Sequence, residues 1–171
     1  MWDRIKRVLR HRWMEESHRL IPPDTVERLK QRVAASEALH SGEIRICIEA
    51  GLPNSYLMRP GNLRTITRQR ALSQFGKLRV WDTEHNNGVL IYLLLAERTI
   101  ELVADRGLNH FVSAQDWSDM VQRLGLALRQ GQFEDGLATA IDEVSAVLVA
   151  RFPLQAGSVR PNELPDQPTL A

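Results

Sequence analysis

The chain has 171 residues, 43% of them hydrophobic and 25% charged. This is the composition of an ordinary folded domain and excludes disordered, collagen-like and fibrous proteins. A chain of this size buries roughly 70% of its unfolded surface on folding, so one core can form without a disulfide or a metal. Its single cysteine, Cys47, excludes an intrachain disulfide as well as zinc-ribbon and CxxC redox sites.

The net charge of +1 hides a separation of charge along the chain. Residues 50–81 carry six basic side chains and no acidic one, whereas residues 82–171 carry thirteen acidic and six basic side chains. Opposite charges attract at close range, so this division predicts either paired faces that neutralise each other or one basic and one acidic surface. The sequence leaves both arrangements open.

Residues 1–20 are predicted to form a basic amphipathic helix, because apolar residues recur there at helical spacing between arginine and lysine residues. Charges interrupt the segment every one or two residues, which is not the pattern of an export signal. Two interpretations stay open: the apolar side packs on the domain, or it lies on a membrane surface. In the second, the membrane-facing candidates are Trp2, Arg4, Lys6, Arg7, Arg10 and Trp13.

Residues 21–153 are predicted to form one α/β domain. A helix begins at Pro22-Pro23 and ends before Ser41-Gly42, and a strand with alternating apolar residues follows over residues 44–49. Residues 51–61 are predicted as a loop. The remaining expected elements are a helix capped by Asn62 and ending at Gly76, a strand over residues 88–96, a strand over residues 99–104, and helices over residues 113–130 and 133–152.

The apolar run over residues 89–96 determines the expected architecture. A continuous apolar run bounded by turn residues predicts a strand that is buried on both faces and needs helices on each side. At eight residues it is far shorter than the ~20 that span a bilayer as a helix. The predicted fold is therefore a three-layer α/β/α sandwich with a small mixed sheet. The last segment, residues 154–171, is proline-rich and is predicted as an extended tail with little packing.

Common catalytic signatures are missing from the sequence. It contains no phosphate-binding P-loop, no GxGxxG, no GxSxG and no HExxH motif. The cysteine-phosphatase loop is also excluded, because Pro53 stands where its arginine would follow Cys47. The five histidines show no metal-ligand spacing.

The polar turn, residues 82–87, is the densest group of oxygen ligands in the sequence. Calcium and magnesium prefer several carboxylate and amide oxygens together, and an aspartate that follows the next strand could join them. The predicted metal ligands are Asp82, Glu84, Asn87 and Asp105, and the predicted anion-binding residues are Arg79 and Arg106. The alternative is a turn without a ligand, in which Asn87-Gly88 supplies positive φ angles and Asp82 caps the turn.

The segment Asn87-Gly88-Val89-Leu90-Ile91 resembles a motif of the TPM domain family. The similarity extends over roughly residues 25–150 through short motifs in the same order. These are Ser41 to Ile46, Phe75 with Trp81, Thr99 to Val103, Arg106-Gly107-Leu108 and Gly131 to Leu137.

The resemblance implies an α/β/α sandwich, the same architecture that the periodicity predicts. Family members are usually secreted or membrane-tethered and are implicated in the assembly or repair of membrane complexes. Some have been assigned acid-phosphatase activity and calcium binding, with acidic residues near the polar turn as the suspected site. This chain departs from the family pattern at Asn86, where an acid is usual, and at Ala104, where glycine is usual. One carboxylate fewer weakens attraction for a divalent cation.

Three functions follow as hypotheses. The first is a noncatalytic or weakly catalytic interaction module in the cytoplasm, docked at the inner membrane face and assembling with an unknown protein partner. The alternative is an acid phosphatase that depends on calcium or magnesium. Nucleic-acid binding through the basic residues 59–79 ranks last, because few aromatic residues are interleaved with them.

Overall fold

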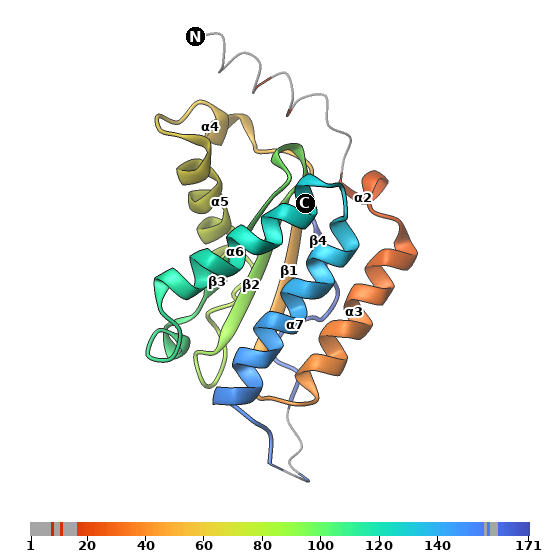
Figure 1. Cartoon of the computed structure of the whole chain (residues 1–171), viewed down its shortest axis with the longest axis vertical. Coiled ribbons are helices and arrows are strands. Elements are labelled where there is room, and N and C mark those ends of the chain that lie inside the picture. The colour runs from red at the N-terminus through yellow and green to blue at the C-terminus, as the bar shows by residue number, and fades with distance from the viewer. Residues whose placement is uncertain (1–7, 9–10, 12–16, 156, 158–160) are drawn as a thin grey trace.

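In the computed structural model, which describes residues 8, 11, 17–155, 157 and 161–171, helices surround a four-stranded sheet (Figure 1). The helices are α2 (Ser17–Leu20), α3 (Pro23–Glu37), α4 (Asn54–Leu57), α5 (Leu63–Lys77), α6 (Ala114–Arg129) and α7 (Phe133–Arg151). The strands are β1 (Glu43–Glu49), β2 (Gly88–Leu94), β3 (Thr99–Ala104) and β4 (Thr169–Leu170). Two short 3-10 turns, η1 (Leu95–Glu97) and η2 (Arg106–Leu108), follow β2 and β3.

The sheet is mixed, with the strand order β3-β2-β1-β4. β1 runs parallel to β2 and to β4, and β3 runs antiparallel to β2. The register pairs Ile46 with Ile91, and Ile91 with Leu102. A parallel pair needs a crossover connection, and α5 supplies it between β1 and β2. The predicted small mixed sheet is confirmed.

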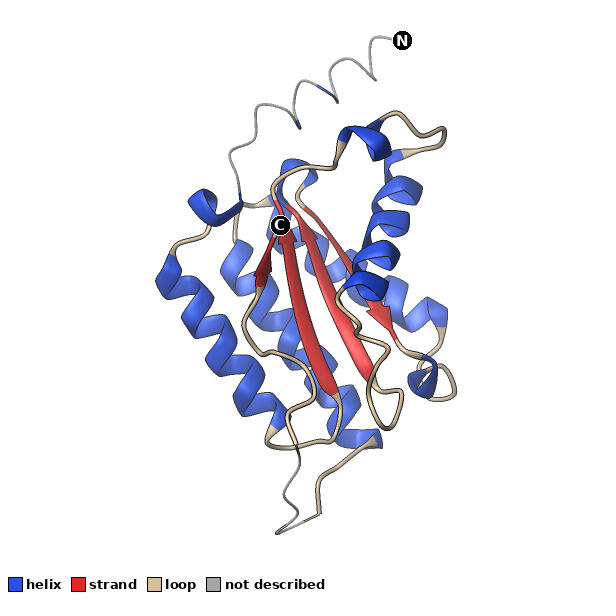
Figure 2. Ribbon diagram, turned by 180° about the vertical axis from the view of Figure 1, so that it is seen from behind, coloured by secondary structure: helices blue, strands red, loops and turns tan. Residues whose placement is uncertain are grey.

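Helices cover both faces of the sheet and make the three layers that the sequence predicts. α3, α6 and α7 pack on one face, where they share a core with β1, β2 and β3. α5 and the short α4 pack on the opposite face (Figure 2). β2 passes through the middle with all seven residues buried. Its side chains alternate between the two cores, with Ile91 on the α7 side and Tyr92 on the α5 side.

Local sequence signals place most helix ends correctly. The Asn62 side chain accepts a hydrogen bond from the backbone N–H of Thr65 at the start of α5. Ser113 and Asp116 form a reciprocal capping box at the start of α6. The strand predicted over residues 88–96 ends at Leu94, because the chain turns through η1 and Arg98, whose φ is 49°. α4 was not predicted: its residues 54–57 lie within the predicted loop.

The prediction that the C-terminal segment packs little is wrong for residues 161–171. Leu164 is 7% exposed, and β4 pairs with β1. The buried carboxylate of Glu43 accepts hydrogen bonds from the backbone N–H groups of Glu163 (3.1 Å) and Leu164 (3.2 Å). The outer side of β1 and a buried carboxylate both need hydrogen-bond partners, and the tail backbone supplies them. Proline content alone carries no sign of this docking.

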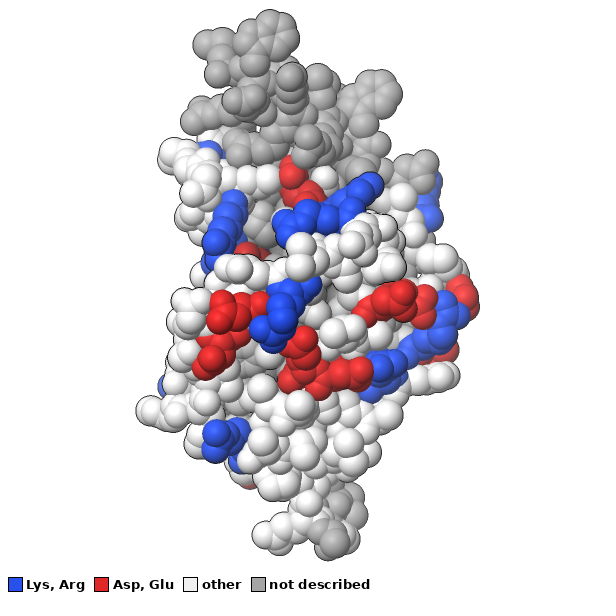
Figure 3. All heavy atoms as spheres, viewed as in Figure 1, with Lys and Arg blue, Asp and Glu red and all other residues white. Residues whose placement is uncertain are grey.

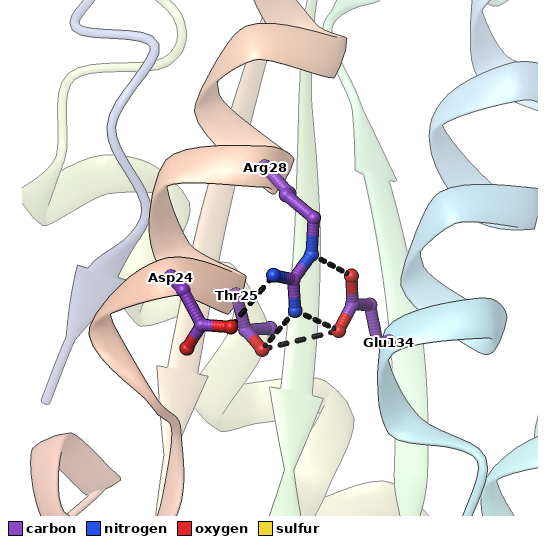
Figure 4. Close-up of polar contacts among 4 residues, drawn as sticks. All are labelled: Asp24, Thr25, Arg28 and Glu134. Carbon is purple, nitrogen blue, oxygen red and sulfur yellow. Dashed lines mark hydrogen bonds and ion pairs between the residues drawn. The ribbon is translucent and has the colours of Figure 1, made fainter.

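Polar side chains also link the layers. Arg28 on α3 holds Glu134 at the start of α7 through two hydrogen bonds, Nε to Oε1 at 2.6 Å and Nη2 to Oε2 at 2.8 Å (Figure 4). On the other side of the sheet, the buried carboxylate of Glu49 is paired with Arg70. It also accepts hydrogen bonds from Tyr92 (2.6 Å) and Gln74 (2.7 Å).

Basic and acidic side chains lie side by side on the face shown in Figure 3. Residues 50–81, the basic segment, also have acidic neighbours. Arg68 pairs with Glu101, Arg70 with Glu49, and Arg79 with Asp82. Of the two arrangements that the charge separation allows, these pairs support neutralising contacts.

Candidate functional site

The polar turn is folded tightly against the end of β3. The backbone N–H of Asn87 donates to the Thr83 hydroxyl (3.1 Å), and that of Gly107 donates to the Asn86 carbonyl (2.9 Å). The positive φ of the turn belongs to Asn86, at 51°, and not to Asn87-Gly88 as the turn interpretation expects. Gly88 is needed for another reason: a Cβ there would lie 2.1 Å from the Val80 carbonyl oxygen.

Asn87 and Asp105 lie at neighbouring strand ends on this side of the sheet. Asn87 precedes β2 and Asp105 follows β3, and the backbone N–H of Asp105 donates to the carbonyl of Gly88 (2.9 Å). The two side chains are 1% and 8% exposed. Asp105 Oδ1 accepts a hydrogen bond from the backbone N–H of Arg106 (2.7 Å), and Asn87 Nδ2 donates to the Ser41 hydroxyl (3.3 Å).

One oxygen of each side chain is left over. Asn87 Oδ1 and Asp105 Oδ2 are both buried, and neither has a hydrogen-bond partner among the described residues. A buried carboxylate or amide oxygen without a partner costs free energy, on the order of 1–3 kcal/mol. Each of these two oxygens, which lie at neighbouring strand ends, is therefore available to a cation or to a water molecule.

The other two predicted metal ligands lie apart from this pair. Asp82 is exposed and paired with Arg79. Glu84 is also exposed, and its backbone N–H donates to Glu163 Oε2 (2.9 Å). Within the described part of the chain, no three His, Cys, Asp or Glu side chains are arranged to hold a metal ion. Of the four residues, Asn87 and Asp105 remain as a candidate pair of ligands.

The two predicted anion-binding arginines have different partners. Arg106 lies at the polar turn, where its Nε donates to Asn86 Oδ1 (3.0 Å). Arg79 is paired with Asp82, the first residue of the same turn, and its guanidinium lies 5.9 Å from the centre of the Trp81 ring. Arg106 thus bonds to the side chain of Asn86, which precedes Asn87 in sequence, and to that of Asp105 at the end of β3.

The membrane-facing candidates Trp2, Arg4, Lys6, Arg7, Arg10 and Trp13 lie outside the described residues. Two neighbours of theirs are described and contact the domain. Val8 packs against the core on the α5 side, and the buried His11 ring accepts a hydrogen bond at Nδ1 from the Leu52 backbone N–H (2.9 Å). Nε2 of the same ring lies 2.9 Å from Glu97 Oε1.

Cys47 is buried in the sheet, with 0% exposure. Burial raises the pKa of its thiol to about 12, and the nearby carboxylate of Glu49 adds to the effect. A thiolate is the reactive form of cysteine, so this residue is not placed to act as a nucleophile.

A groove along the outer side of β3 was missed by sequence reasoning. It consists of two adjoining cavities of about 700 and 330 Å³ between α5 and α6, and both are lined by Arg64, Glu101 and Val121. We call it the edge groove. Arg68 and Trp117 line the larger cavity, and Arg98 and Arg129 the smaller one.

Part of the edge groove could have been expected from the sequence, because the basic segment contains Arg64 and Arg68. The other half comes from residues 98, 117 and 129, which no local pattern connects to that segment. Other arginines of the basic segment go elsewhere: Arg70 is paired with Glu49, and the Arg59 guanidinium lies 3.8 Å from the centre of the Tyr56 ring. Arg59 and Arg70 therefore do not line the edge groove.

A mixed four-stranded sheet covered by helices on both faces, with a tight polar turn before the central strand, defines a class of three-layer α/β sandwich domains. Within this class the family profile described as "TPM domain" matches residues 15–147. The chain belongs to the TPM domain family, which confirms the resemblance found in its motifs.

Two solved structures are similar. The BA42 protein of the psychrophilic bacterium Bizionia argentinensis is 26% identical with a TM-score of 0.70, over 87% of this chain and 94% of that one. The N-terminal domain of a protein from P. gingivalis is 20% identical with a TM-score of 0.56, over 78% of this chain and 79% of that one, and shows the fold alone. No curated protein matches the chain. Among the described helices, none is long and apolar enough to cross a membrane.

Proposed function

We propose that this TPM domain binds a divalent cation at Asn87 and Asp105 and works as an interaction or assembly module, with little or no catalysis of its own. The observation that carries the cation site is the pair of buried oxygens, Asn87 Oδ1 and Asp105 Oδ2, without hydrogen-bond partners among the described residues. Calcium and magnesium are bound by carboxylate and amide oxygens, with waters completing the shell. With one carboxylate in the pair, the site is weak and favours a cation in excess.

The test is thermal unfolding of the intact chain with calcium or magnesium added. A ligand that binds only the folded state stabilises it by about 1.4 kcal/mol at tenfold its Kd, which shifts the Tm by a few degrees in a chain of this size. We expect Asp105→Asn to abolish this shift, because it keeps the shape and removes the charge.

Asp82→Asn is the matched control, since Asp82 belongs to the same turn but is exposed and paired with Arg79. It should retain the full response to the cation. The proposed site would be contradicted if neither cation at millimolar concentration changed the Tm of the wild type. Equal responses of Asp105→Asn and Asp82→Asn would contradict it as well.

The interaction role is supported by the edge groove, which is large, partly apolar and lined by arginines from two helices and a turn. Interfaces of proteins are enriched in arginine and aromatic residues, and Arg64, Arg68 and Trp117 are of these kinds. The single thiol of the chain, Cys47, is buried and has a raised pKa, so it is a poor nucleophile, which agrees with little or no catalysis.

Docking at the inner face of the membrane through residues 1–13 is part of this proposal. Because His11 contacts Leu52 and Glu97, deleting the segment would also disturb the domain. Charge reversal of Lys6, Arg7 and Arg10 in the intact chain avoids this. We expect the reversed protein to lose co-sedimentation with anionic phospholipid vesicles, and equal recovery of both proteins would reject the docking.

A metal-dependent acid phosphatase is the second candidate, and the position of Arg106 favours it. A guanidinium beside a bound cation can share the negative charge that develops on a transferred phosphoryl group. Hydrolysis of an activated phosphate ester at acidic and neutral pH, with and without calcium or magnesium, tests this candidate. Arg106→Met should then abolish activity and Arg79→Met should not, whereas no cation-dependent hydrolysis by the wild type would reject it.

A further inference from the structure

β3 forms one edge of the sheet, and no described strand pairs with its outer side. The N–H of Asp105 bonds to the Gly88 carbonyl, so the backbone of residues 99, 101 and 103 points to β2 by the alternation of an antiparallel pair. The backbone of Ile100, Leu102 and Ala104 therefore points outward. The Arg68 guanidinium donates to the Leu102 carbonyl, which agrees with that direction. The far edge of the sheet, in contrast, is covered by β4.

The outward edge of β3 opens into the edge groove. Residues 101, 102 and 104 of β3 line the larger cavity, and residues 99 to 101 line the smaller one. α5 and α6 form the two walls, and both pack against β3. The lining includes apolar side chains such as Val121 and the partly buried Trp117. An exposed strand edge between two walls is a template for one more strand.

The charge of the groove is one-sided. Its arginines are Arg64, Arg68, Arg98 and Arg129, whereas Glu101 is the only carboxylate among the residues that line it. Glu101 is already engaged with Arg68, at 3.3 Å from guanidinium to carboxylate. The lining therefore carries an excess of positive charge, which selects an acidic occupant.

Polar atoms without partners are concentrated here as well. Of the buried side-chain nitrogen and oxygen atoms that lack a hydrogen-bond partner among the described residues, three belong to groove residues: Thr67 Oγ1, Thr99 Oγ1 and Trp117 Nε1. Thr67 is 2% exposed. Each of these groups can donate a hydrogen bond to a carbonyl or carboxylate oxygen.

We propose that the edge groove binds an extended, acidic segment of a partner protein, which adds to the sheet as a strand beside β3. The segment's backbone pairs with the outward groups of Ile100, Leu102 and Ala104, and its carboxylates meet Arg64, Arg98 and Arg129. Arg68 covers the Leu102 carbonyl in the free protein. On binding, a peptide N–H takes that carbonyl, and Arg68 turns to a peptide carboxylate.

The geometry favours a peptide over other occupants. A second copy of this chain could pair its own β3 with this edge only by entering between α5 and α6. Its β3 is flanked by the same two helices, which would collide with those of the first copy. A nucleic acid would need stacking surfaces along a basic track, and Trp117 is the only aromatic residue that lines the groove. The inference rests on the interaction role proposed above and is independent of the cation site.

The test is fluorescence polarisation with the intact chain and labelled twelve-residue peptides. The first peptide alternates glutamate and valine, the second has lysine for glutamate, and the third keeps the glutamates but has three consecutive central prolines, which cannot add a strand. We expect the first to bind, the second not to bind, and the third to bind at least tenfold more weakly. Arg64→Glu combined with Arg129→Glu should weaken the first peptide at least tenfold.

The matched control is Arg19→Glu with Lys30→Glu, which makes the same change of charge on α2 and α3, away from β3 (Figure 1). It should bind within about twofold of the wild type. Melting curves check that the variants fold, and Arg98→Glu replaces the double variant if that one does not.

Equal weakening by the groove and control variants, or equal binding of the proline peptide, overturns the proposal. So does tighter binding of single-stranded DNA at the same salt concentration, or a dimer in sedimentation that the groove variant dissociates. Peptide titrations with and without calcium separate this inference from the cation site. If the wild-type chain does not bind the first peptide but still shows a calcium-dependent Tm, the proposed groove is overturned and the cation site is not.

Discussion

Arg28 joins the first turns of two helices that are far apart in the sequence. Its guanidinium bonds to Glu134 on α7 and to Asp24 on its own helix, the latter at 2.6 Å (Figure 4). The hydrogen bonds that Glu134 accepts, chiefly from Arg28 and also from Thr25, hold the pKa of its carboxyl below the ordinary value of 4.5. The carboxylate is also at the N-terminus of α7, where the helix dipole favours negative charge.

The consequence is a pH-dependent share of stability. Because the pKa of Glu134 is lowered by folding, its contribution is fully present above the unfolded value and is lost as the pH falls through the folded one. We expect Arg28→Met to lower the urea midpoint at pH 7 and to have a smaller effect at pH 3. Both side chains are partly exposed, so the change is modest and weakens with salt. A difference that stays constant across this pH range would contradict the assignment.

At the scale of elements, the C-terminal segment acts as an accessory strand of the sheet. Arg45 on β1 donates to the carbonyl of Pro165 and, at 2.6 Å, to that of Gln167. The N–H of Ala171 donates to the Ile48 carbonyl (2.9 Å). The segment is therefore held mostly by its backbone, which its composition does not reveal.

We expect Arg45→Met to loosen residues 161–171 without unfolding the domain. Amide hydrogen exchange should accelerate at Leu164 and Ala171, and the amides of Glu101 and Val103, which point from β3 to β2 at the opposite edge, should keep their protection. Tyr92 and the other β2 residues serve as an internal control for global stability. Uniform acceleration across the sheet would show instead that the tail and the domain open together.

At the scale of the molecule, Cys47 reports on the integrity of the core between the sheet and α5. It lies on β1 between the layers, fully buried, with a thiol pKa raised to about 12. In the native protein we expect no reaction with a thiol reagent at pH 8, and a labelling midpoint in urea that coincides with the loss of helical signal. Labelling well below that midpoint would mean that β1 opens while the helices persist.

Most of the fold was predictable because its signals are local. The apolar run after Gly88 predicts a strand buried on both faces, and β2 is that strand. Asn62 and the Ser113–Asp116 pair mark helix starts through hydrogen bonds that span three residues. Such signals depend on neighbours in sequence and survive without knowledge of the rest of the chain.

The candidate site was predictable only in part. The polar turn and Asp105 were identified from residue type, but the register of β2 with β3 determines which of these residues become neighbours. It puts Asn87 and Asp105 at adjacent strand ends, whereas Asp82 pairs with Arg79. The edge groove was not identified, since its arginines come from α5, a hairpin turn and the end of α6. Their proximity is a product of packing.

The sequence by itself determined the layered α/β architecture, the family and the boundaries of the long helices, because periodicity, caps and short motifs act over a few residues. Only the tertiary structure decided which charges are neutralised, which two oxygens remain without partners at the polar turn, where the proline-rich tail docks and which edge of the sheet stays open. These features depend on contacts between residues that are distant in the chain, and such contacts exist only after the layers have closed on one another.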